Sequence, residues 1–433
     1  MPDEIKLIDM DALWRRMLLV VPIGLVLVGI WFGALWGLGN TVAEHAPNLE
    51  VAQFAAQLAP DDPQVHYTLA VLRRRSFLPE ELVEALRQYE EAARLSPNDY
   101  RLWLELGRVR GQTGDYAGGE QALRRAVELA PFYSSPRWHL GNLLLRAGRT
   151  DDAFAELRRA ADAHPFDLRP QVFNLAWQVY NADVPSVAAA VGNSATVRAE
   201  LTTYLLKQKQ LDEARRIWLS LSEAERKEQR PPGEALLRAL VEARRFHAAL
   251  EVGRDLAPEG ASRPEMGRLL NGGFEEEVVA PGMSFWGWQI APVAQMQLGL
   301  DARLRHGGER SLRLVFNAYS VPSVTNVSQL IIVAPGARYR LRYSVRTEDL
   351  KSVSTLITEI VDAGAEPGRV LATAEPLANG TSDWQTVALD FNVPAHTEAI
   401  TVRLNRVLCP DQVCPLFGKV WYDDFDLQRV GSA

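Results

Sequence analysis

Two acidic clusters and two tryptophans contain the residue types with which this 433-residue chain could do chemistry. These residues are Glu275, Glu276, Glu277, Trp286, Trp288, Asp423, Asp424 and Asp426. Two carboxylates facing each other across a sugar can hydrolyse a glycosidic bond. Carboxylate oxygens are also the ligands that calcium prefers, and aromatic faces can stack on pyranose rings. The elements that carry these residues decide among the three kinds of site.

Composition and charge exclude several classes of protein. The chain is 47% hydrophobic and 23% charged, which is ordinary for folded domains. Its net charge of -7 lacks the basic excess that is typical of nucleic-acid-binding proteins. The sequence contains no HExxH, G-x-S-x-G, Walker loop, dinucleotide fingerprint or four-ligand zinc pattern. We therefore expect a protein that is not an enzyme and does not bind nucleic acid.

An uncharged apolar segment, residues 17–38, lies near the N-terminus. Its 22 residues are about the length of a helix that spans a bilayer. A cleaved signal peptide is the alternative, but the apolar core of a signal peptide is usually only about 7–15 residues long. The spacing of Gly29, Gly33 and Gly37 places them on one helix face, as in helix-packing motifs of membranes. We expect residues 17–38 to be a transmembrane anchor.

Basic residues predict the orientation of this anchor. Lys6, Arg15 and Arg16 precede the apolar segment, and no Lys or Arg follows it until Arg73. The positive-inside rule therefore places residues 1–16 in the cytoplasm as a short tail. We expect a single-pass protein whose bulk is periplasmic or extracellular, as in a bacterial inner membrane.

A regular spacing of prolines organises residues 45–260. Pro97, Pro131 and Pro165 are 34 residues apart, and each ends an apolar helical run. Pro60 fits one step earlier if the first repeat carries three extra residues. Proline ends a helix because it cannot donate the next backbone hydrogen bond. The period predicts an array of paired helices.

The segment 100–131 carries the repeat pattern most fully. Trp103 and Gly107 fall on its first helix, and Ala122 and Ala126 fall on its second. Small residues at such positions let two helices approach closely. This unit resembles tetratricopeptide repeats, and roughly six helix pairs would make a self-supporting solenoid. The resemblance implies a groove that binds peptide segments or protein partners.

Clusters of arginine occur along these repeats. They are Arg73 to Arg75, Arg124 with Arg125, and Arg158 with Arg159. We expect these arginines to pair with neighbouring glutamates on solvated helix faces, and not to form a basic binding surface.

The period changes after a linker at residues 261–268. Tyr339, Leu341, Tyr343 and Val345 alternate with polar residues, so they share one face of a strand. Residues 311–316, 386–393 and 399–407 alternate in the same way. Strands separated by turn residues predict an antiparallel β-sandwich over residues 269–428. The fold class is therefore multidomain α + β: a transmembrane helix, an all-α solenoid and an all-β sandwich.

Five landmarks of this second half occur in a recognisable order. They are LLNGGFEEE, RHGGERSLRL, VSQLIIVAPGARYRLRYSVRT, SDWQTVALDFNVP and VWYDDFDL. In this order they resemble carbohydrate-binding modules of families four and nine, which are jelly rolls with a galactose-binding-like sandwich. The likeness runs from Leu269 to Leu427. It implies that NGGFE forms the first strand and that Trp288 lies in the core.

The resemblance also implies a sugar site and a structural metal. Trp286 and Tyr319 are the candidates for an aromatic surface platform. Outward-facing polar residues that could line a groove for a sugar or an anionic polymer are Arg340, Arg342, Arg403 and Asn405. Many members of the group hold a structural calcium near the ends of the first and last strands. Glu275 and Asp424 match those positions, with a carbonyl of Gly307 or Gly308 as a further candidate ligand.

The two cysteines lie close together near the C-terminus. Cys409 and Cys414 are the only cysteines in the chain. Two thiols are too few for a zinc site, and an oxidising exterior favours disulfides. We expect a local disulfide between them.

Two hypotheses for function remain open. The first is an adaptor whose solenoid binds protein partners while its sandwich binds glycan, for example in envelope polysaccharide assembly or export. The second is a structural interaction protein whose sandwich binds no sugar. Exposure of Trp286 and Tyr319 would favour the first, and their burial would favour the second.

Overall fold

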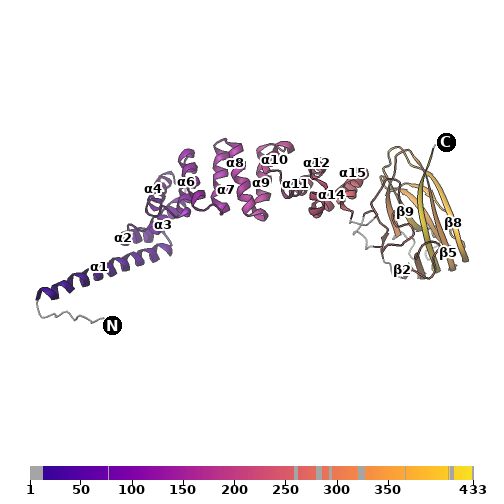
Figure 1. The fold of residues 1–433 in the computed structure, drawn as a ribbon, viewed down its shortest axis with the longest axis horizontal. Helices are drawn as coiled ribbons and strands as arrows, with labels where there is room; N and C mark the ends of the chain where they lie inside the picture. The colour runs from indigo at the N-terminus through magenta and orange to yellow at the C-terminus, as the bar shows by residue number, and fades with distance from the viewer. Residues whose placement is uncertain are drawn as a thin grey trace, which may run out of the picture. The chain divides into compact units, whose positions relative to one another are not determined.

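The computed structural model describes residues 13–76, 78–257, 262–278, 285–291, 295–319, 327–365, 367–407, 409 and 414–431. Most of the predicted cytoplasmic tail, including Lys6, lies outside the described residues. Helices α1 to α15 come first along the chain and strands β1 to β10 follow (Figure 1). This order confirms the predicted fold class. The chain divides into two compact units, Met1–Asn193 and Ser194–Ala433.

The first unit is helical. Its elements are α1 (Leu13–Glu44), α2 (Leu49–Leu58), α3 (Pro63–Arg74), α4 (Pro79–Leu95), α5 (Tyr100–Gln112), α6 (Tyr116–Leu129), α7 (Ser134–Arg146), α8 (Thr150–Ala163), α9 (Pro165–Val179) and α10 (Val184–Val191).

The part of helix α1 between Val20 and Glu44 is long and apolar enough to cross a membrane. A membrane span and a signal sequence both have this length and composition. Its apolar side chains from Val20 to Leu27 are exposed. The end of the same helix is different. Ala43 is buried, and the Asn40 side-chain amide donates a hydrogen bond of 2.8 Å to Asp62. The apolar helix therefore continues without a break into the first helix–helix contacts of the array.

Glycines spaced by one repeat explain how the helices of a pair approach each other. A β-carbon on Gly107 would lie 2.6 Å from the Leu123 side chain. A β-carbon on Gly141, one repeat later, would lie 2.6 Å from the Leu157 side chain. Real atoms do not approach so closely, so α5 can pack on α6, and α7 on α8, only because these positions lack a side chain.

Most of these arginines pair with glutamates. Arg124, Arg125 and Arg159 pair with Glu120, Glu128 and Glu156 of their own helices, as expected. Arg73 and Arg74 instead pair with Glu81 and Glu105 of other helices. Arg158 departs from this pattern, because it donates to the carbonyl oxygens of Ala189 and Ala190.

The second unit combines helices with the sandwich. Its helices are α11 (Ala195–Lys207), α12 (Leu211–Leu219), α13 (Glu223–Glu228), α14 (Arg230–Glu242) and α15 (Phe246–Leu256). Its strands are β1 (Gln289–Ile290), β2 (Met296–Asp301), β3 (Ser311–Tyr319), β4 (Val327–Ile332), β5 (Arg338–Lys351), β6 (Leu356–Asp362), β7 (Val370–Thr373), β8 (Gly380–Asn392), β9 (Ala399–Arg406) and β10 (Leu416–Val430).

The strands form two five-stranded antiparallel sheets. One has the order β1-β4-β9-β6-β7 and the other the order β2-β3-β10-β5-β8. Tyr339, Leu341, Tyr343 and Val345 of β5 are all buried in the core between them, as their alternation predicts. Strand β6 is buried along its whole length, so it has no alternation that sequence reasoning could detect.

The segment predicted as the first strand is not a strand. Residues 271–278 form turns and irregular chain, and both Asn271 and Phe274 have positive φ angles, of 49° and 57°. A β-carbon on Gly272 would lie 1.9 Å from the carbonyl oxygen of Phe425, so the chain passes directly against β10. Trp288 is buried beside this segment and stacks on Phe274, which confirms its predicted place in the core.

The last helices and the sandwich contact each other within the second unit. The backbone N–H of His247, in α15, donates a 3.0 Å hydrogen bond to the Glu398 carboxylate next to β9. The Arg244 guanidinium donates a 3.0 Å hydrogen bond to the carbonyl oxygen of Gly364. The turn between α14 and α15 is thus fixed to one end of the sheet that contains β4, β9 and β6.

Candidate functional site

The two candidate aromatic residues do not form a surface platform. Trp286 is 8% exposed and Tyr319 is 1% exposed. A sugar stacks on the open face of an aromatic ring, and neither ring presents one. The prediction that these two side chains form an exposed platform is therefore wrong.

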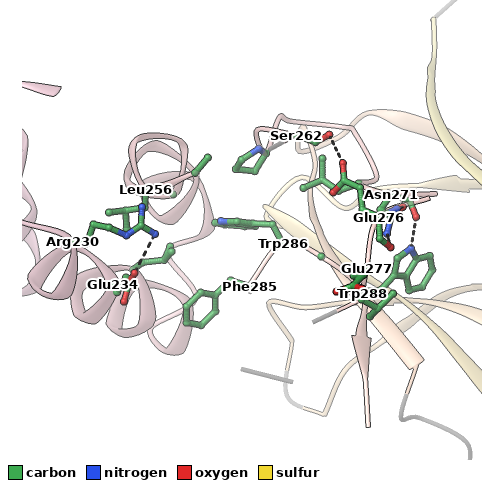
Figure 2. Close-up of a pocket in the computed structure, with 17 residues that line it drawn as sticks. Arg230, Glu234, Leu256, Ser262, Asn271, Glu276, Glu277, Phe285, Trp286 and Trp288 are labelled. Carbon is green, nitrogen blue, oxygen red and sulfur yellow. Dashed lines mark hydrogen bonds and ion pairs between the residues drawn. The ribbon is translucent and has the colours of Figure 1, made fainter. Parts of the chain in front are cut away.

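Trp286 is buried because it reaches from the sandwich to α15. Figure 2 shows its side chain directed towards the helices that carry Arg230, Glu234 and Leu256. A β-carbon on Gly253 of α15 would lie 2.6 Å from the indole Nε1. The indole therefore packs directly on the helix backbone, where a side chain would otherwise stand.

Tyr319 is buried beside an internal arginine. The guanidinium of Arg406 lies 5.9 Å from the centre of the Tyr319 ring, and Arg406 is only 3% exposed. It also donates to the carbonyl oxygens of Tyr319, Ser354 and Cys414. Burial lowers the pKa of Arg406. Tyr319 thus belongs to a buried polar network, which the alternating pattern of β3 did not reveal.

The four polar candidates are divided between two sheets. Arg340 and Arg342 lie on β5, whereas Arg403 and Asn405 lie on β9 of the other sheet. They cannot line one groove together, which corrects the sequence-based grouping.

Three of these four side chains also donate hydrogen bonds to carboxylates. The Arg340 guanidinium binds Asp390 through two hydrogen bonds of 2.6 and 2.7 Å. Arg403 and Asn405 both donate to Glu359, at 2.8 and 2.9 Å. Arg342 is exposed.

The two candidate metal ligands meet at one glycine turn. Glu275 Oε1 accepts hydrogen bonds from the backbone N–H groups of Glu309 and Arg310, at 2.9 and 3.4 Å. A β-carbon on Gly308 would lie 1.8 Å from this oxygen, and one on Gly307 would lie 2.5 Å from Asp424 Oδ1. The absence of side chains at both glycines lets the two carboxylates lie against the same turn.

This turn has some of the oxygen ligands that calcium needs. Within the described part of the chain, neither Glu275 Oε2 nor Asp424 Oδ1 takes part in a hydrogen bond, so each is open to a hard cation. The carbonyl oxygen of Gly308 already accepts a hydrogen bond from Arg305. Among the described residues no group of three or more His, Cys, Asp or Glu side chains is arranged to hold a metal ion. Backbone and water oxygens would have to complete the six to eight ligands, and calcium here stays a prediction.

A histidine beside this turn brings together the residue types of an acyl-transfer site. His306 Nδ1 lies 2.5 Å from Asp424 Oδ2 and 3.3 Å from the Ser344 hydroxyl. A nucleophile–base–acid relay needs the serine and the carboxylate on different ring nitrogens. Here both contact Nδ1, so the three residues do not form a relay.

Asp423 is the buried member of the same acidic cluster. Burial raises its pKa, although backbone N–H groups of His306, Gly307 and Asp424 donate to it and partly oppose that rise. These hydrogen bonds tie the turn at residues 306–307 to β10. Its arrangement indicates a structural role for this carboxylate.

The two cysteines form the predicted disulfide. Cys409 and Cys414 are bonded, with their α-carbons 6.0 Å apart. The carbonyl oxygen of Cys414 accepts a 2.7 Å hydrogen bond from Arg406. The disulfide therefore joins Cys409 to the buried polar network around Arg406.

A cavity of about 330 Å³ lies between the last helices and the sandwich. Its walls include Trp286 and Trp288 from one side and Arg230, Glu234 and Leu256 from the other (Figure 2). Arg230 and Glu234 form an ion pair of 3.3 Å. Glu276 and Glu277 also line the cavity, and Glu276 accepts a hydrogen bond from the Ser262 hydroxyl. The cavity therefore lies at a contact between elements of one unit.

A second cavity, of about 250 Å³, lies between helices of the repeats. Its lining is more polar and consists of Arg108, Gln112, Leu123, Trp138, His139, Asn142, Leu143 and Arg146. Sequence reasoning did not identify this site. The signal was the 34-residue period, which puts Arg108 in register with Asn142 and Gln112 in register with Arg146. We call these eight residues the repeat cavity.

Comparison with known proteins supports the repeats. Residues 81–134 and 110–167 match the family model described as tetratricopeptide repeat. The helical region is tetratricopeptide-like. A stretch of 88 residues is 31% identical to Protein O-mannosyl-transferase TMTC1 of Mus musculus, and it covers 20% of this chain and 9% of that protein. The chain thus spans less than a tenth of the length of this curated relative.

Solved structures resemble parts of the chain at low similarity. The crystal structure of MamA matches 33% of this chain and 82% of its own, with 17% identity and a TM-score of 0.29. The structure titled "CBM4 structure and function" matches 37% of this chain and 99% of its own, with 16% identity and a TM-score of 0.27. YrrB, described as a tetratricopeptide repeat protein with an unusual peptide-binding site, matches 48% and 91%, with 18% identity and a TM-score of 0.26.

Proposed function

We propose that this protein is a membrane-anchored, extracytoplasmic scaffold that binds a protein partner through its tetratricopeptide-like helices. In this proposal the sandwich is a structural end-piece of the last helices and binds no sugar. The observation that carries this choice is the burial of Trp286 against Gly253 of α15. Together with the burial of Tyr319, it supports the structural hypothesis over the glycan-binding adaptor.

Membrane attachment is part of the proposal. The exposed apolar side chains of α1 support an anchor, since no protein surface covers them in the described chain. The disulfide between Cys409 and Cys414 supports an oxidising compartment for the sandwich. Free thiols at both positions in protein taken from its native membrane would contradict this placement.

We also propose that the protein is not an enzyme. The shared use of Nδ1 by Ser344 and Asp424 supports this, because the one serine–histidine–carboxylate group near the acidic cluster in the described residues lacks relay geometry.

Photo-crosslinking in whole cells tests the scaffold function. A photoreactive amino acid is placed at Gln112 or Arg146, in the repeat cavity, or at Val353, which is 72% exposed on the sandwich. We expect a discrete crosslinked protein from residue 112 and none at the same mass from residue 353. Failure to crosslink any protein from residue 112 or residue 146 would contradict partner binding by the repeats.

Affinity electrophoresis of the full chain in detergent tests the role of the sandwich. We expect the mobility of the protein to be unchanged by polysaccharides embedded in the gel, with calcium present. Retardation by one polysaccharide would restore the glycan-binding adaptor.

A further inference from the structure

The repeat cavity combines unpaired positive charge with fixed hydrogen-bond donors. Helix α5 contributes Arg108 and Gln112, and helix α7 contributes His139, Asn142 and Arg146. Residues separated by three or four positions lie on the same helix face, so each helix presents its polar residues to the cavity as one stripe.

The charges around the cavity do not balance. Glu105 is the neighbouring carboxylate, and it is shared by two arginines, at 2.9 Å from Arg74 and 2.6 Å from Arg108. Arg146 is exposed and forms no ion pair with any carboxylate of the described residues. The cavity lining contains two guanidinium groups, of Arg108 and Arg146, and no carboxylate, which leaves an excess of positive charge at the cavity.

The lowered pKa of His139 agrees with this excess of positive charge. Burial, together with the positive charges of Arg108 and Arg146, lowers the pKa of His139 to about 4, against a smaller opposing effect of Glu105. The imidazole is therefore neutral at neutral pH, and the two arginines supply the charge.

The polar groups that line the cavity favour an acceptor. Guanidinium groups have donors and no acceptors, and they bind carboxylates with two parallel hydrogen bonds. The Asn142 side-chain amide donates to the carbonyl oxygen of Trp138 at 2.8 Å, which fixes the orientation of the side chain at the cavity wall. Arg108 remains partly accessible, with its side chain 33% exposed.

We propose that the repeat cavity binds a carboxylate side chain, from aspartate or glutamate, of an acidic segment in the partner protein. This inference rests on the proposed scaffold function, and it specifies the chemistry of the partner. The carboxylate lies between Arg108 and Arg146. Unmodified protein segments carry their negative charge as carboxylates, so this ligand follows from a protein partner without any modifying enzyme.

Fluorescence anisotropy with the full chain in detergent tests the proposal. The first probe is a labelled, amidated peptide of about ten residues with alternating Asp and Gly, and the second replaces each Asp with Asn. We expect the Asp peptide to bind and the Asn peptide to bind at least about tenfold more weakly, because a charge-assisted hydrogen bond is stronger than a neutral one. Binding should weaken as salt is raised, since exposed charges are screened within about 10 Å at 0.1 M salt.

Charge reversal locates the site. Arg146→Glu removes the exposed guanidinium, and Gln112→Glu adds a carboxylate on the opposite helix. Arg124→Glu is the matched control, because Arg124 is 49% exposed but already paired with Glu120 on α6, outside the cavity. We expect at least a tenfold loss of affinity in the first two variants and unchanged affinity in the control. Equal affinity in Arg146→Glu and Arg124→Glu, with both folded by circular dichroism, overturns the proposal.

The outcomes separate the inference from the proposed function. If residue 112 crosslinks a protein in cells but the Asp peptide does not bind, the scaffold function stands and the acidic ligand is wrong. A phosphoserine peptide that binds more tightly than the Asp peptide also overturns the carboxylate assignment. If residues 112 and 146 crosslink no protein, the proposed function itself fails.

Discussion

Trp286 stands so close to Gly253 that a β-carbon on residue 253 would lie 2.6 Å from the indole nitrogen. A residue that precedes the first strand thus packs on the backbone of the last helix, about thirty positions earlier in the chain. Because large buried aromatic side chains contribute strongly to stability, this contact couples the last helices to the sandwich.

Substitution at this contact is expected to loosen it. Trp286→Ala removes a large buried side chain, and such changes cost about 3–5 kcal/mol. Gly253→Val places a branched side chain where the indole lies. Both variants should increase hydrogen exchange of the α15 amides. Gly299→Ala, where a β-carbon meets no atom within 4 Å, is the control and should leave exchange unchanged. Unchanged exchange in Trp286→Ala would contradict the coupling.

The buried Arg406 is expected to stabilise the sandwich. Arg406→Met keeps much of the volume but leaves the carbonyl oxygens of Tyr319, Ser354 and Cys414 without this donor. An unsatisfied buried polar group costs about 1–3 kcal/mol, so the sandwich should unfold at lower denaturant concentration. The fluorescence change of its tryptophans in urea measures this. Arg342→Met, on the exposed face of β5, should unfold at the same urea concentration as the wild type. A shared midpoint for all three proteins would show that the internal arginine is dispensable.

Calcium is expected to stabilise the glycine turn. If a cation joins Glu275 to Asp424, adding millimolar calcium after chelation should raise the melting temperature of the full chain, because a ligand that binds only the folded state stabilises it. Glu275→Gln and Asp424→Asn should each abolish the rise. Asp426→Asn, also on β10, serves as the control and should retain it. An unchanged melting temperature of the wild-type protein on calcium addition would contradict a calcium site at this turn.

The lowered pKa of His139 predicts a pH dependence of stability. Its folded pKa of about 4 lies below the usual histidine pKa of 6.5, so between these values the unfolded chain binds more protons than the folded chain. The free energy of unfolding should therefore fall as the pH is lowered from about 6.5 towards 4. His139→Gln, which cannot titrate, should lose part of this dependence. Urea unfolding followed by circular dichroism at several pH values measures the difference, and identical slopes for the two proteins would contradict the assignment.

Local periodicity was enough to predict the classes of element. The proline period of 34 residues gave the helix pairs, because each proline must end a helix. Period-two alternation on β5 placed Tyr339 and Leu341 in the core. The disulfide followed from two cysteines close together in the chain. In each case the deciding interaction lies within a short stretch of sequence.

Contacts between distant residues decided the rest. Trp286 appeared as a surface aromatic because its partner Gly253 lies in another element, and only packing brings them together. Arg340 and Arg403 have the same outward alternation, yet strand order puts them on different sheets. The repeat cavity likewise exists only where α5 lies beside α7. Sequence patterns report which face of an element is apolar, whereas the neighbour that covers or pairs with that face is set by the tertiary fold.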